Sequence, residues 1–320
     1  MIDRSESRPE THVTIFGGSG FIGRYVCEYL LQAGVRLRVA VRDPRTAFFL
    51  QPLAQVGQFG AVRADLGGRE SVAAAVKGAD CVINLCGAFR TMEAVHVEGA
   101  RIVAEEARAA GASSLVHVSA IGADPQSNST YGRTKGEGED AVRAAFPGAT
   151  IIRPSLVFGP EDALTNRFAA MGRMPVVPVL AAKARFQPVY VRDLAQVIAA
   201  AALDPARHGG KIYEIGGPEV LTMLDLHRAI FAQTGQSPDL VELPDIAGTL
   251  LSKFGFLPGA PLTGDQWKML QHDNVVAPGA QGVAAFGIAP TPLAAVAGEW
   301  LDRFRSRKSA GRRLTSSTAA

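Results

Sequence analysis

Short apolar runs alternate with longer segments of helical periodicity over the first half of the chain. The apolar runs predict strands at 13–16, 35–41, 80–86, 114–118 and 149–152, with a shorter strand that begins at Val62. The helical patterns start at Gly23 and then cover 69–77, 93–110 and 131–145. Strands that alternate with helices of this length predict an α/β fold, a Rossmann-type doubly wound parallel sheet.

The pattern changes after residue 155, where prolines and glycines become frequent. Helical segments are expected at 163–172, 193–203, 222–235, 245–253 and 292–306, with short strands at 189–191 and 212–215. This predicts a smaller, mixed C-terminal lobe over 156–306, after an NAD(P)-binding domain at 12–155 to which the chain returns near 186–216. A flexible N-terminus at 1–11 and a basic, disordered tail at 307–320 complete the expected organisation.

A glycine-rich turn joins the first predicted strand to the first predicted helix. It reads Gly17-Gly18-Ser19-Gly20-Phe21-Ile22-Gly23. Glycines allow a tight turn and a close approach of the backbone to a pyrophosphate, and the amides at the helix start then stabilise the anion. We therefore expect a dinucleotide to be held by Gly17, Ser19, Gly20, Phe21, Ile22 and Gly23.

Charged residues after the second and third strands indicate which dinucleotide is preferred. A carboxylate after the second strand is typical of NAD binding, but Arg42 stands there, followed by Asp43 and Arg45. A guanidinium matches a ribose 2′-phosphate, so Arg42 and Arg45 favour NADP(H); if Asp43 instead binds the ribose, NAD remains the alternative. Asp65 and Leu66 are expected near the adenine.

Tyr131 and Lys135 lie one helical turn apart at the start of the predicted helix 131–145. Residues four apart share a helix face, so the ammonium of Lys135 is expected to lower the pKa of the Tyr131 phenol and to bond the nicotinamide ribose. Both are candidate catalytic and cofactor-binding residues. Because parallel sheets bind ligands beyond the carboxyl ends of their strands, the remaining expected contacts are Cys86, Gly87, Ala88, Val118, Ser119, Pro154 and Val157.

Together these motifs resemble the extended and atypical short-chain dehydrogenase/reductase superfamily, which is epimerase/dehydratase-like. The resemblance covers most of the chain and includes Asp65-Leu66, Asn84–Gly87, Arg153-Pro154 and the segment 186–195. The segments 96–111, 117–124, 153–162, 166–171 and 273–276 further resemble one branch of it. That branch contains the nucleotide-binding accessory subunit of respiratory complex I (NADH:ubiquinone oxidoreductase) and its bacterial relatives. The resemblance implies a tightly held NADPH, complex I subunits as partners, and a peripheral position on the membrane complex.

One departure from the superfamily bears on catalysis. A Ser-Ser or Ser-Thr pair normally ends the fifth strand and donates a hydrogen bond to the substrate carbonyl, but here the pair reads Ser119-Ala120. Losing one such donor costs on the order of 3 kcal/mol of transition-state stabilisation. Ser119 could replace the missing donor only with a shifted backbone. The change weakens the case for turnover but does not remove it, because Tyr131 and Lys135 are both present.

Three functions therefore stay open. The first is an accessory subunit of complex I that keeps its dinucleotide without turning it over. The second is a free-standing NADP(H)-dependent reductase, dehydratase or epimerase that acts on a small carbonyl or sugar-like substrate with Tyr131 as acid/base. The third is a nucleotide-sensing scaffold that changes partners with the bound nucleotide.

Composition narrows the partners and the location. A net charge of +3 and no base-reading module give no argument for nucleic-acid binding, and the three cysteines suggest neither a disulfide framework nor a metal site. The chain shows no apolar stretch of membrane-spanning length. We expect a cytoplasmic protein, at the cytoplasmic face of the bacterial inner membrane if it joins complex I. The basic tail, from Arg303 to Arg313, could contact anionic lipid.

Overall fold

The computed structural model describes residues 11–253 and 262–305. Its contacts divide the chain into two compact units, and each is built from separate stretches of sequence. The first unit comprises residues 11–154, 191–215 and 276–289, and the second comprises 155–190, 216–253, 262–275 and 290–305. The expected N-terminal segment 1–11, apart from Thr11, and the expected tail 307–320 lie outside the described residues.

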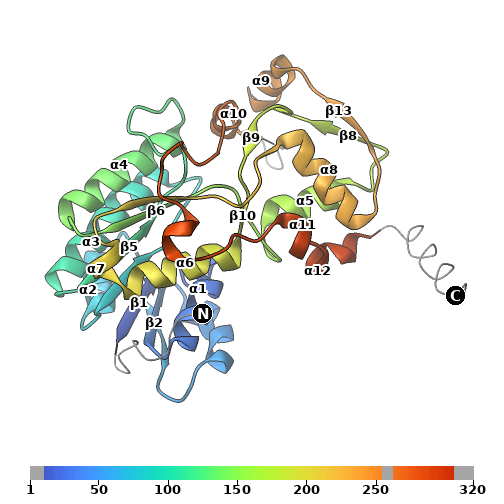
Figure 1. Ribbon diagram of the computed structural model, residues 1–320. Coiled ribbons are helices and arrows are strands. Elements are labelled where there is room, and N and C mark those ends of the chain that lie inside the picture. The colour runs from blue at the N-terminus through green and yellow to red at the C-terminus, as the bar shows by residue number, and fades with distance from the viewer. Residues whose placement is uncertain (1–10, 254–261, 306–320) are drawn as a thin grey trace, which may run out of the picture. The chain divides into compact units, whose positions relative to one another are not determined.

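The first unit contains a seven-stranded sheet in which every neighbouring pair is parallel (Figure 1). The order is β11-β6-β5-β4-β1-β2-β3. The strands are β1 (His12–Phe16), β2 (Arg36–Val41), β3 (Phe59–Arg63), β4 (Cys81–Asn84), β5 (Ser114–Val118), β6 (Thr150–Pro154) and β11 (Ile212–Ile215). This confirms the predicted doubly wound α/β fold. The strand order reverses between β1 and β4, and sheets of this kind bind their ligands at this switch point, beyond the carboxyl ends of the strands.

Two groups of helices cover this sheet. Helices α1 (Phe21–Gln32) and α6 (Val191–Leu203) contact each other, while α2 (Arg69–Val76), α3 (Ala100–Ala109) and α4 (Thr130–Ala145) form a contiguous second group. All residues of β4 and β5 are buried, as expected for central strands covered on both faces. Shorter elements complete the unit: η1 (Pro44–Leu53), α7 (Pro205–His208) and η3 (Val283–Phe286).

Two elements of the first unit differ from the sequence prediction. The third strand begins at Phe59 rather than Val62, because Gly60 interrupts the apolar pattern without preventing the strand from pairing with β2. The expected helix 93–110 starts as a π-helix, η2 (Glu93–Gly99), and becomes an α-helix only from Ala100. A π-turn inserts extra backbone and often occurs at functional sites.

The second unit has three two-stranded sheets and several helices. Strand β7 (Val157–Phe158) pairs with β10 (Val189–Tyr190), β8 (Val176–Val179) with β13 (Asp239–Glu242), and β9 (Arg185–Phe186) with β12 (Leu221–Thr222). The helices are α5 (Ala163–Met171), α8 (Met223–Thr234), α9 (Asp245–Lys253), α10 (Gly264–Leu270), α11 (Leu293–Val296) and α12 (Gly298–Leu301), followed by η4 (Asp302–Phe304). The single helix predicted at 292–306 is wrong: it is broken around Gly298, a poor helix former, and ends as a 3₁₀ turn.

Asn274 joins three segments of the second unit. Its side-chain Oδ1 accepts hydrogen bonds from Ser155 Oγ (2.7 Å) and from the Leu156 backbone amide (3.1 Å). Its carbonyl accepts from the amide of Gln187 at 3.1 Å. The 273–276 segment singled out from the sequence thus has a structural role in this unit.

Candidate functional site

The glycine-rich turn between β1 and α1 has the geometry expected of a phosphate-binding loop. Gly20 N donates to Gly17 O at 3.0 Å, and Gly20 caps α1 without any side-chain hydrogen bond. A Cβ on Gly23 would lie 2.3 Å from Gly17 O, so no other residue fits there without moving the turn. The first amides of α1 have no acceptor within their own helix, and the positive end of the helix dipole favours an anion beside them.

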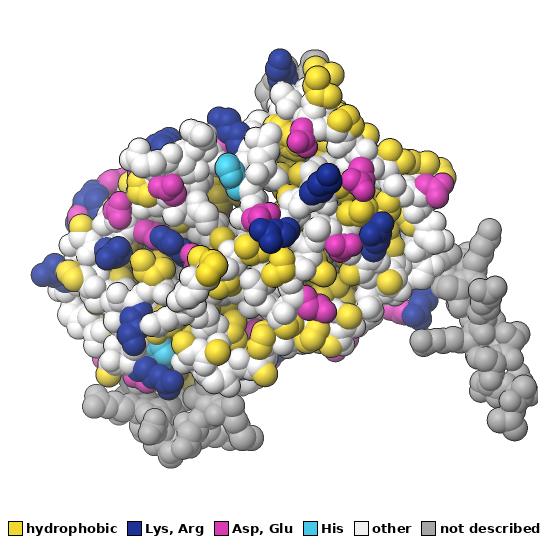
Figure 2. All heavy atoms as spheres, turned by 45° about the horizontal axis from the view of Figure 1, so that its top comes forward, with side chains coloured by type: hydrophobic (Ala, Val, Ile, Leu, Met, Phe, Trp, Pro, Cys, Tyr) yellow, Lys and Arg dark blue, Asp and Glu magenta, His cyan; other side chains and the backbone are white. Residues whose placement is uncertain are grey.

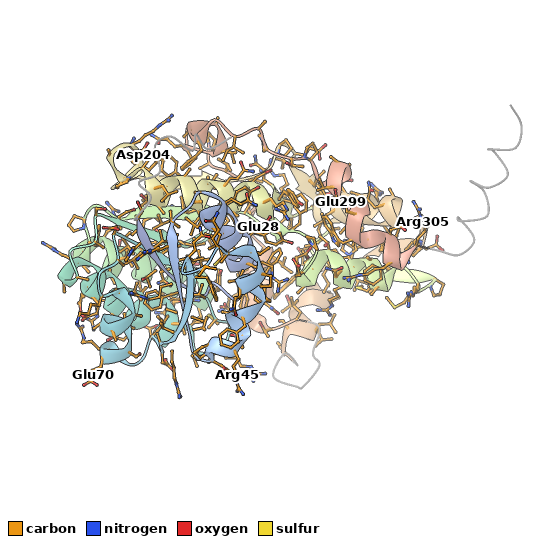
Figure 3. All side chains as sticks on the ribbon, turned by 90° about the horizontal axis from the view of Figure 1, so that it is seen from below. Glu28, Arg45, Glu70, Asp204, Glu299 and Arg305 are labelled. Atoms are coloured by element: carbon orange, nitrogen blue, oxygen red, sulfur yellow. The ribbon has the colours of Figure 1, made fainter. Side chains whose placement is uncertain are left out.

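The two arginines after β2 are in different situations. Arg45 forms a bidentate ion pair with Asp43, in which Nη2 and Oδ2 are 2.9 Å apart, and its side chain is 82% exposed. Figure 3 labels Arg45 at the periphery of the first unit. Arg42 is also exposed, and its charge acts on the Cys86 thiol beyond β4. The charge of Arg42 therefore reaches the end of β4, while Arg45 is held by a carboxylate.

Asp65 and Leu66 follow β3 in a tight turn. One carboxylate oxygen of Asp65 accepts the Gly67 amide at 3.0 Å, and its backbone amide donates to Ser71 Oγ at 3.0 Å. The Leu66 side chain packs against Gly99 at the end of η2. These contacts fix the direction of the loop, and Asp65 as a whole is exposed.

The loop after β4 is organised by two side chains. Asn84 Oδ1 accepts the Cys86 amide at 3.1 Å, and the amide of Ala88 donates to His96 Nε2 at 3.0 Å. Gly87 is exposed between them. Burial raises the pKa of the Cys86 thiol to about 11, so this cysteine stays a neutral thiol.

Lys135 is buried beneath the carboxyl end of β5. Its Nζ donates to the Val118 carbonyl at 3.1 Å. Burial lowers the pKa of Lys135 to about 8, while Cys86 and Glu139 act in the opposite direction. The predicted residues Val118 and Lys135 therefore touch, on the β5 side of the switch point.

The surroundings of Tyr131 are aromatic. The ring of Phe89, which is 62% exposed, stacks on Tyr131 at 5.2 Å between centroids, and His96 meets it edge-on at 5.4 Å. Burial raises the pKa of Tyr131 to about 12. The direction is opposite to the one expected from Lys135, because desolvation by burial dominates and the ammonium of Lys135 donates to the Val118 carbonyl.

Ser119 and Ala120 follow β5. The Ser119 amide donates to the Ile152 carbonyl at 2.7 Å, and its hydroxyl is buried without a hydrogen-bond partner among the described residues. Ala120 provides no donor at the position where the superfamily has a hydroxyl. Tyr131, the expected acid–base residue, is thus present without the hydroxyl expected at position 120.

The last two predicted cofactor contacts fall in different units. Pro154 ends β6 in the first unit, and Val157 begins β7 in the second.

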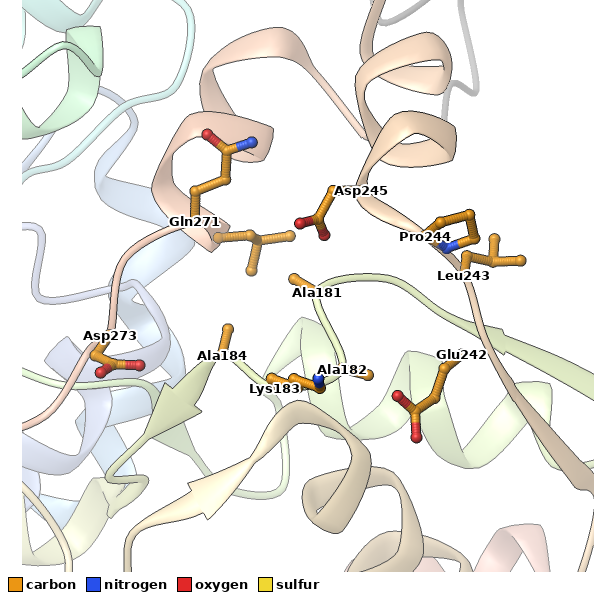
Figure 4. A pocket seen from close by; sticks show the side chains of 11 residues that line it. Ala181, Ala182, Lys183, Ala184, Glu242, Leu243, Pro244, Asp245, Gln271 and Asp273 are labelled. Atoms are coloured by element: carbon orange, nitrogen blue, oxygen red, sulfur yellow. The ribbon is translucent and has the colours of Figure 1, made fainter.

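The second unit also contains a hollow of about 700 Å³ that none of the predicted residues line (Figure 4). Its charged residues are Lys183, Glu242, Asp245 and Asp273, and the last of these is paired with Arg185.

Three residues of the site were missed by sequence reasoning. They are Phe89, which stacks on Tyr131, His96, which contacts both Ala88 and Tyr131, and Thr134, whose Oγ1 is 2.9 Å from His96 Nδ1. A lone histidine in a helical pattern carries no signal of its own, and the π-turn that presents it does not follow from hydrophobic periodicity.

Residues 13–216 match the NAD dependent epimerase/dehydratase family, and the chain belongs to this family. It is 34% identical over 303 residues to the mitochondrial NADH dehydrogenase [ubiquinone] 1 alpha subcomplex subunit 9 of Mus musculus, covering 92% of this chain and 80% of that protein. It is 28% identical over 303 residues to the NADH-ubiquinone oxidoreductase 40 kDa subunit of Neurospora crassa, covering 92% and 79%.

The chain is also 36% identical over 260 residues to the ceramide reductase of Caulobacter vibrioides, which covers 78% of this chain and 80% of that protein. Among solved structures, the NADPH-dependent quinone oxidoreductase of Escherichia coli in complex with NADPH superposes with a TM-score of 0.71. That match has 21% identity and covers 90% of this chain and 99% of the other. At this identity the superposition supports the fold alone.

Residues 11–253 and 262–305 contain neither a metal-binding cluster nor a membrane-spanning helix. No group of three or more His, Cys, Asp or Glu side chains there could hold a metal ion. No helix in these ranges has the length and apolarity to span a bilayer. Acidic and basic side chains are interspersed over the face drawn in Figure 2.

Proposed function

We propose that this chain is a nucleotide-binding accessory subunit of respiratory complex I, which holds NADP(H) tightly and does not turn it over. It would lie at the periphery of the complex, on the cytoplasmic face of the inner membrane. The observation that carries the proposal is that the glycine turn has a geometry suited to a pyrophosphate, while Ala120 stands where a hydroxyl was expected and Tyr131 is desolvated.

The proposed binding half consists of the amides of the glycine turn and the guanidinium of Arg42, which is exposed. The close approach that Gly23 permits and the uncapped start of α1 suit a pyrophosphate. Arg42 suits a ribose 2′-phosphate, because it follows β2, its charge acts on Cys86 at the end of β4, and Arg45 neutralises the neighbouring Asp43. This charge arrangement supports NADP(H) over NAD.

The catalytic half argues against turnover. A bound nicotinamide would supply or accept a hydride, but the chain must also supply a proton and stabilise charge on the substrate oxygen. Burial raises the pKa of Tyr131 above that of free tyrosine, and the side chain of Ala120 cannot donate a hydrogen bond. The raised pKa of Tyr131 slows proton transfer, and the missing hydroxyl leaves charge on the substrate oxygen less stabilised.

The names of two relatives support complex I as the partner. Two proteins that are named as subunits of mitochondrial NADH dehydrogenase align over 92% of this chain. Affinity purification of the tagged chain from native membranes, followed by native mass spectrometry, tests both parts of the proposal. We expect complex I subunits to copurify and NADP(H) to remain bound. Recovery of the chain without complex I subunits would reject the partner, and recovery without any dinucleotide would reject the cofactor.

A second function, that of a free-standing NADP(H)-dependent reductase, is favoured by two observations. Tyr131 and Lys135 are both retained, and a relative at 36% identity is named a ceramide reductase. Consumption of NADPH with a carbonyl substrate, abolished by Tyr131→Phe with nucleotide binding unchanged, would establish this function instead. A ceramide-type ketone belongs in the substrate panel beside small ketones and sugar nucleotides.

A further inference from the structure

We propose that His96 is a positioning residue of the dinucleotide site, which fixes the loop after β4 to the helix that carries Tyr131 and Lys135. The inference rests on the proposed nucleotide site and adds a residue to it. His96 would act through its neighbours and need not touch the nucleotide itself.

The hydrogen bonds of His96 define its tautomer. Its Nε2 accepts the backbone N–H of Ala88 at 3.0 Å, and a backbone amide can only donate. The proton of the neutral ring is therefore on Nδ1, which donates to Thr134 Oγ1 at 2.9 Å. Thr134 in turn donates to the Thr130 carbonyl at 2.9 Å. One imidazole thus connects the loop to α4 through two directed bonds.

The ring stays neutral because of where it lies. His96 is 1% exposed, and burial together with the charge of Lys135 lowers its pKa to about 4. Protonation would also place a second proton on Nε2, against the Ala88 N–H. The connection therefore persists at every pH at which the protein is expected to work.

The backbone of His96 is held as firmly as its side chain. It lies in the π-helix η2, and a Cβ on Gly138 of α4 would be 2.0 Å from the His96 carbonyl oxygen. The edge-on contact of its ring with Tyr131 completes the arrangement. Moving His96 would therefore release the Ala88 amide and loosen the packing around the phenol at the same time.

Three substitutions distinguish the effect of losing the hydrogen bond to Ala88 from the effect of losing the volume of the ring. His96→Gln can place an amide oxygen near the position of Nε2, His96→Asn reaches only the position of Nδ1, and His96→Phe fills the space without an acceptor. His208→Phe is the matched control, because His208 is a buried imidazole of the same unit with one bond, to Tyr213 at 2.8 Å.

The first measurement is hydrogen–deuterium exchange of the peptide covering 85–90, without added nucleotide. We expect at least tenfold faster exchange in His96→Asn and His96→Phe, and exchange close to wild type in His96→Gln and in the His208→Phe control. Equal exchange at 85–90 in all four variants would overturn the positioning role. If the His96 variants fail to fold, Thr134→Val removes the acceptor of Nδ1 instead. Exchange of the 85–90 peptide that equals wild type in Thr134→Val would also overturn the positioning role.

The second measurement is calorimetric binding of NADPH. We expect His96→Asn and His96→Phe to bind about tenfold more weakly than wild type and His96→Gln to bind within about twofold, since tenfold is about 1.4 kcal/mol, the size of one well-formed hydrogen bond. Wild-type affinity in His96→Phe, with weaker binding in His96→Asn and His96→Gln, would indicate a packing role only and contradict the inference. A wild-type protein that binds neither NADPH nor NADH would refute the proposed function, and the exchange measurement would still decide whether His96 holds the loop.

Discussion

At the scale of single residues, Arg42 and Arg45 show how two neighbouring positive charges can have different roles. Arg45 is held by Asp43, and this ion pair on an exposed surface contributes little stability. It does neutralise the carboxylate that would otherwise repel a 2′-phosphate. Arg42 is then the arginine whose guanidinium is available for recognition.

The two arginines should therefore respond differently to substitution. We expect Arg42→Ala to weaken NADP⁺ binding about tenfold or more, because one charge-assisted contact to a phosphate is lost, and to leave NAD⁺ binding within about twofold. Arg45→Ala should change either affinity by no more than about twofold. Isothermal titration calorimetry with both nucleotides measures this, and an equal loss for NAD⁺ and NADP⁺ in Arg42→Ala would show that the residue does not read the phosphate.

Lys135 makes stability depend on pH in a defined direction. Its pKa is about 8 in the folded protein, against about 10.5 for an unfolded lysine, so between these values the unfolded state binds more protons. The unfavourable contribution of Lys135 is complete below pH 8 and is relieved as the pH rises toward 10.5.

Comparison with Lys135→Met isolates this effect from the other titrating groups. We expect the free energy of unfolding of wild type, relative to Lys135→Met, to rise by about 3 kcal/mol between pH 7 and pH 10.5. Urea denaturation at several pH values in this range provides the measurement. A constant difference, or one that falls with pH, would mean that Lys135 titrates normally in the folded protein.

At the scale of elements, helix α4 has a low helix propensity but packs closely against its neighbours. It contains three glycines, Gly132, Gly136 and Gly138, each of which lowers helix stability by about 1 kcal/mol relative to alanine. Gly138 meets the backbone of η2, where a side chain has no room. The helix therefore depends on its tertiary contacts and is held in one position by them.

Gly138→Ala separates propensity from packing. Propensity alone predicts stabilisation by about 1 kcal/mol, whereas the contact with the His96 carbonyl predicts destabilisation by about 1–3 kcal/mol. We expect the second result in a urea denaturation experiment, with Ala144→Gly at an exposed position of α4 as the control that reports propensity alone. A more stable Gly138→Ala protein would show that α4 and η2 can move apart freely.

How much the sequence could predict differs between kinds of element. The central strands were predictable because they are short, apolar and β-branched, and the glycine turn because its chemistry requires a fixed spacing. The strands of the second unit were mostly missed, since β9 and β12 have two residues each and show no periodicity. His96 and Phe89 were missed because their roles come from contacts between segments that only the fold brings together.

At the scale of the whole molecule, a ligand that binds only the folded state should stabilise the chain. At a free concentration 100 times its Kd, NADP(H) is expected to add about 2.7 kcal/mol to the free energy of unfolding. Thermal or urea unfolding with increasing NADPH tests this, with NADH at equal concentration as the comparison. No shift with either nucleotide would contradict the dinucleotide site.

The interleaving of the two units has a consequence for synthesis on the ribosome. Strand β11 pairs with β6, but residues 155–190 of the second unit are translated between them. Until Ile215 has emerged, β6 remains an open edge of a nearly finished sheet, and such edges recruit strands from other chains. A nascent chain that stalls before this point is therefore exposed to aggregation, and no single cut divides the gene into two parts that each encode a complete unit.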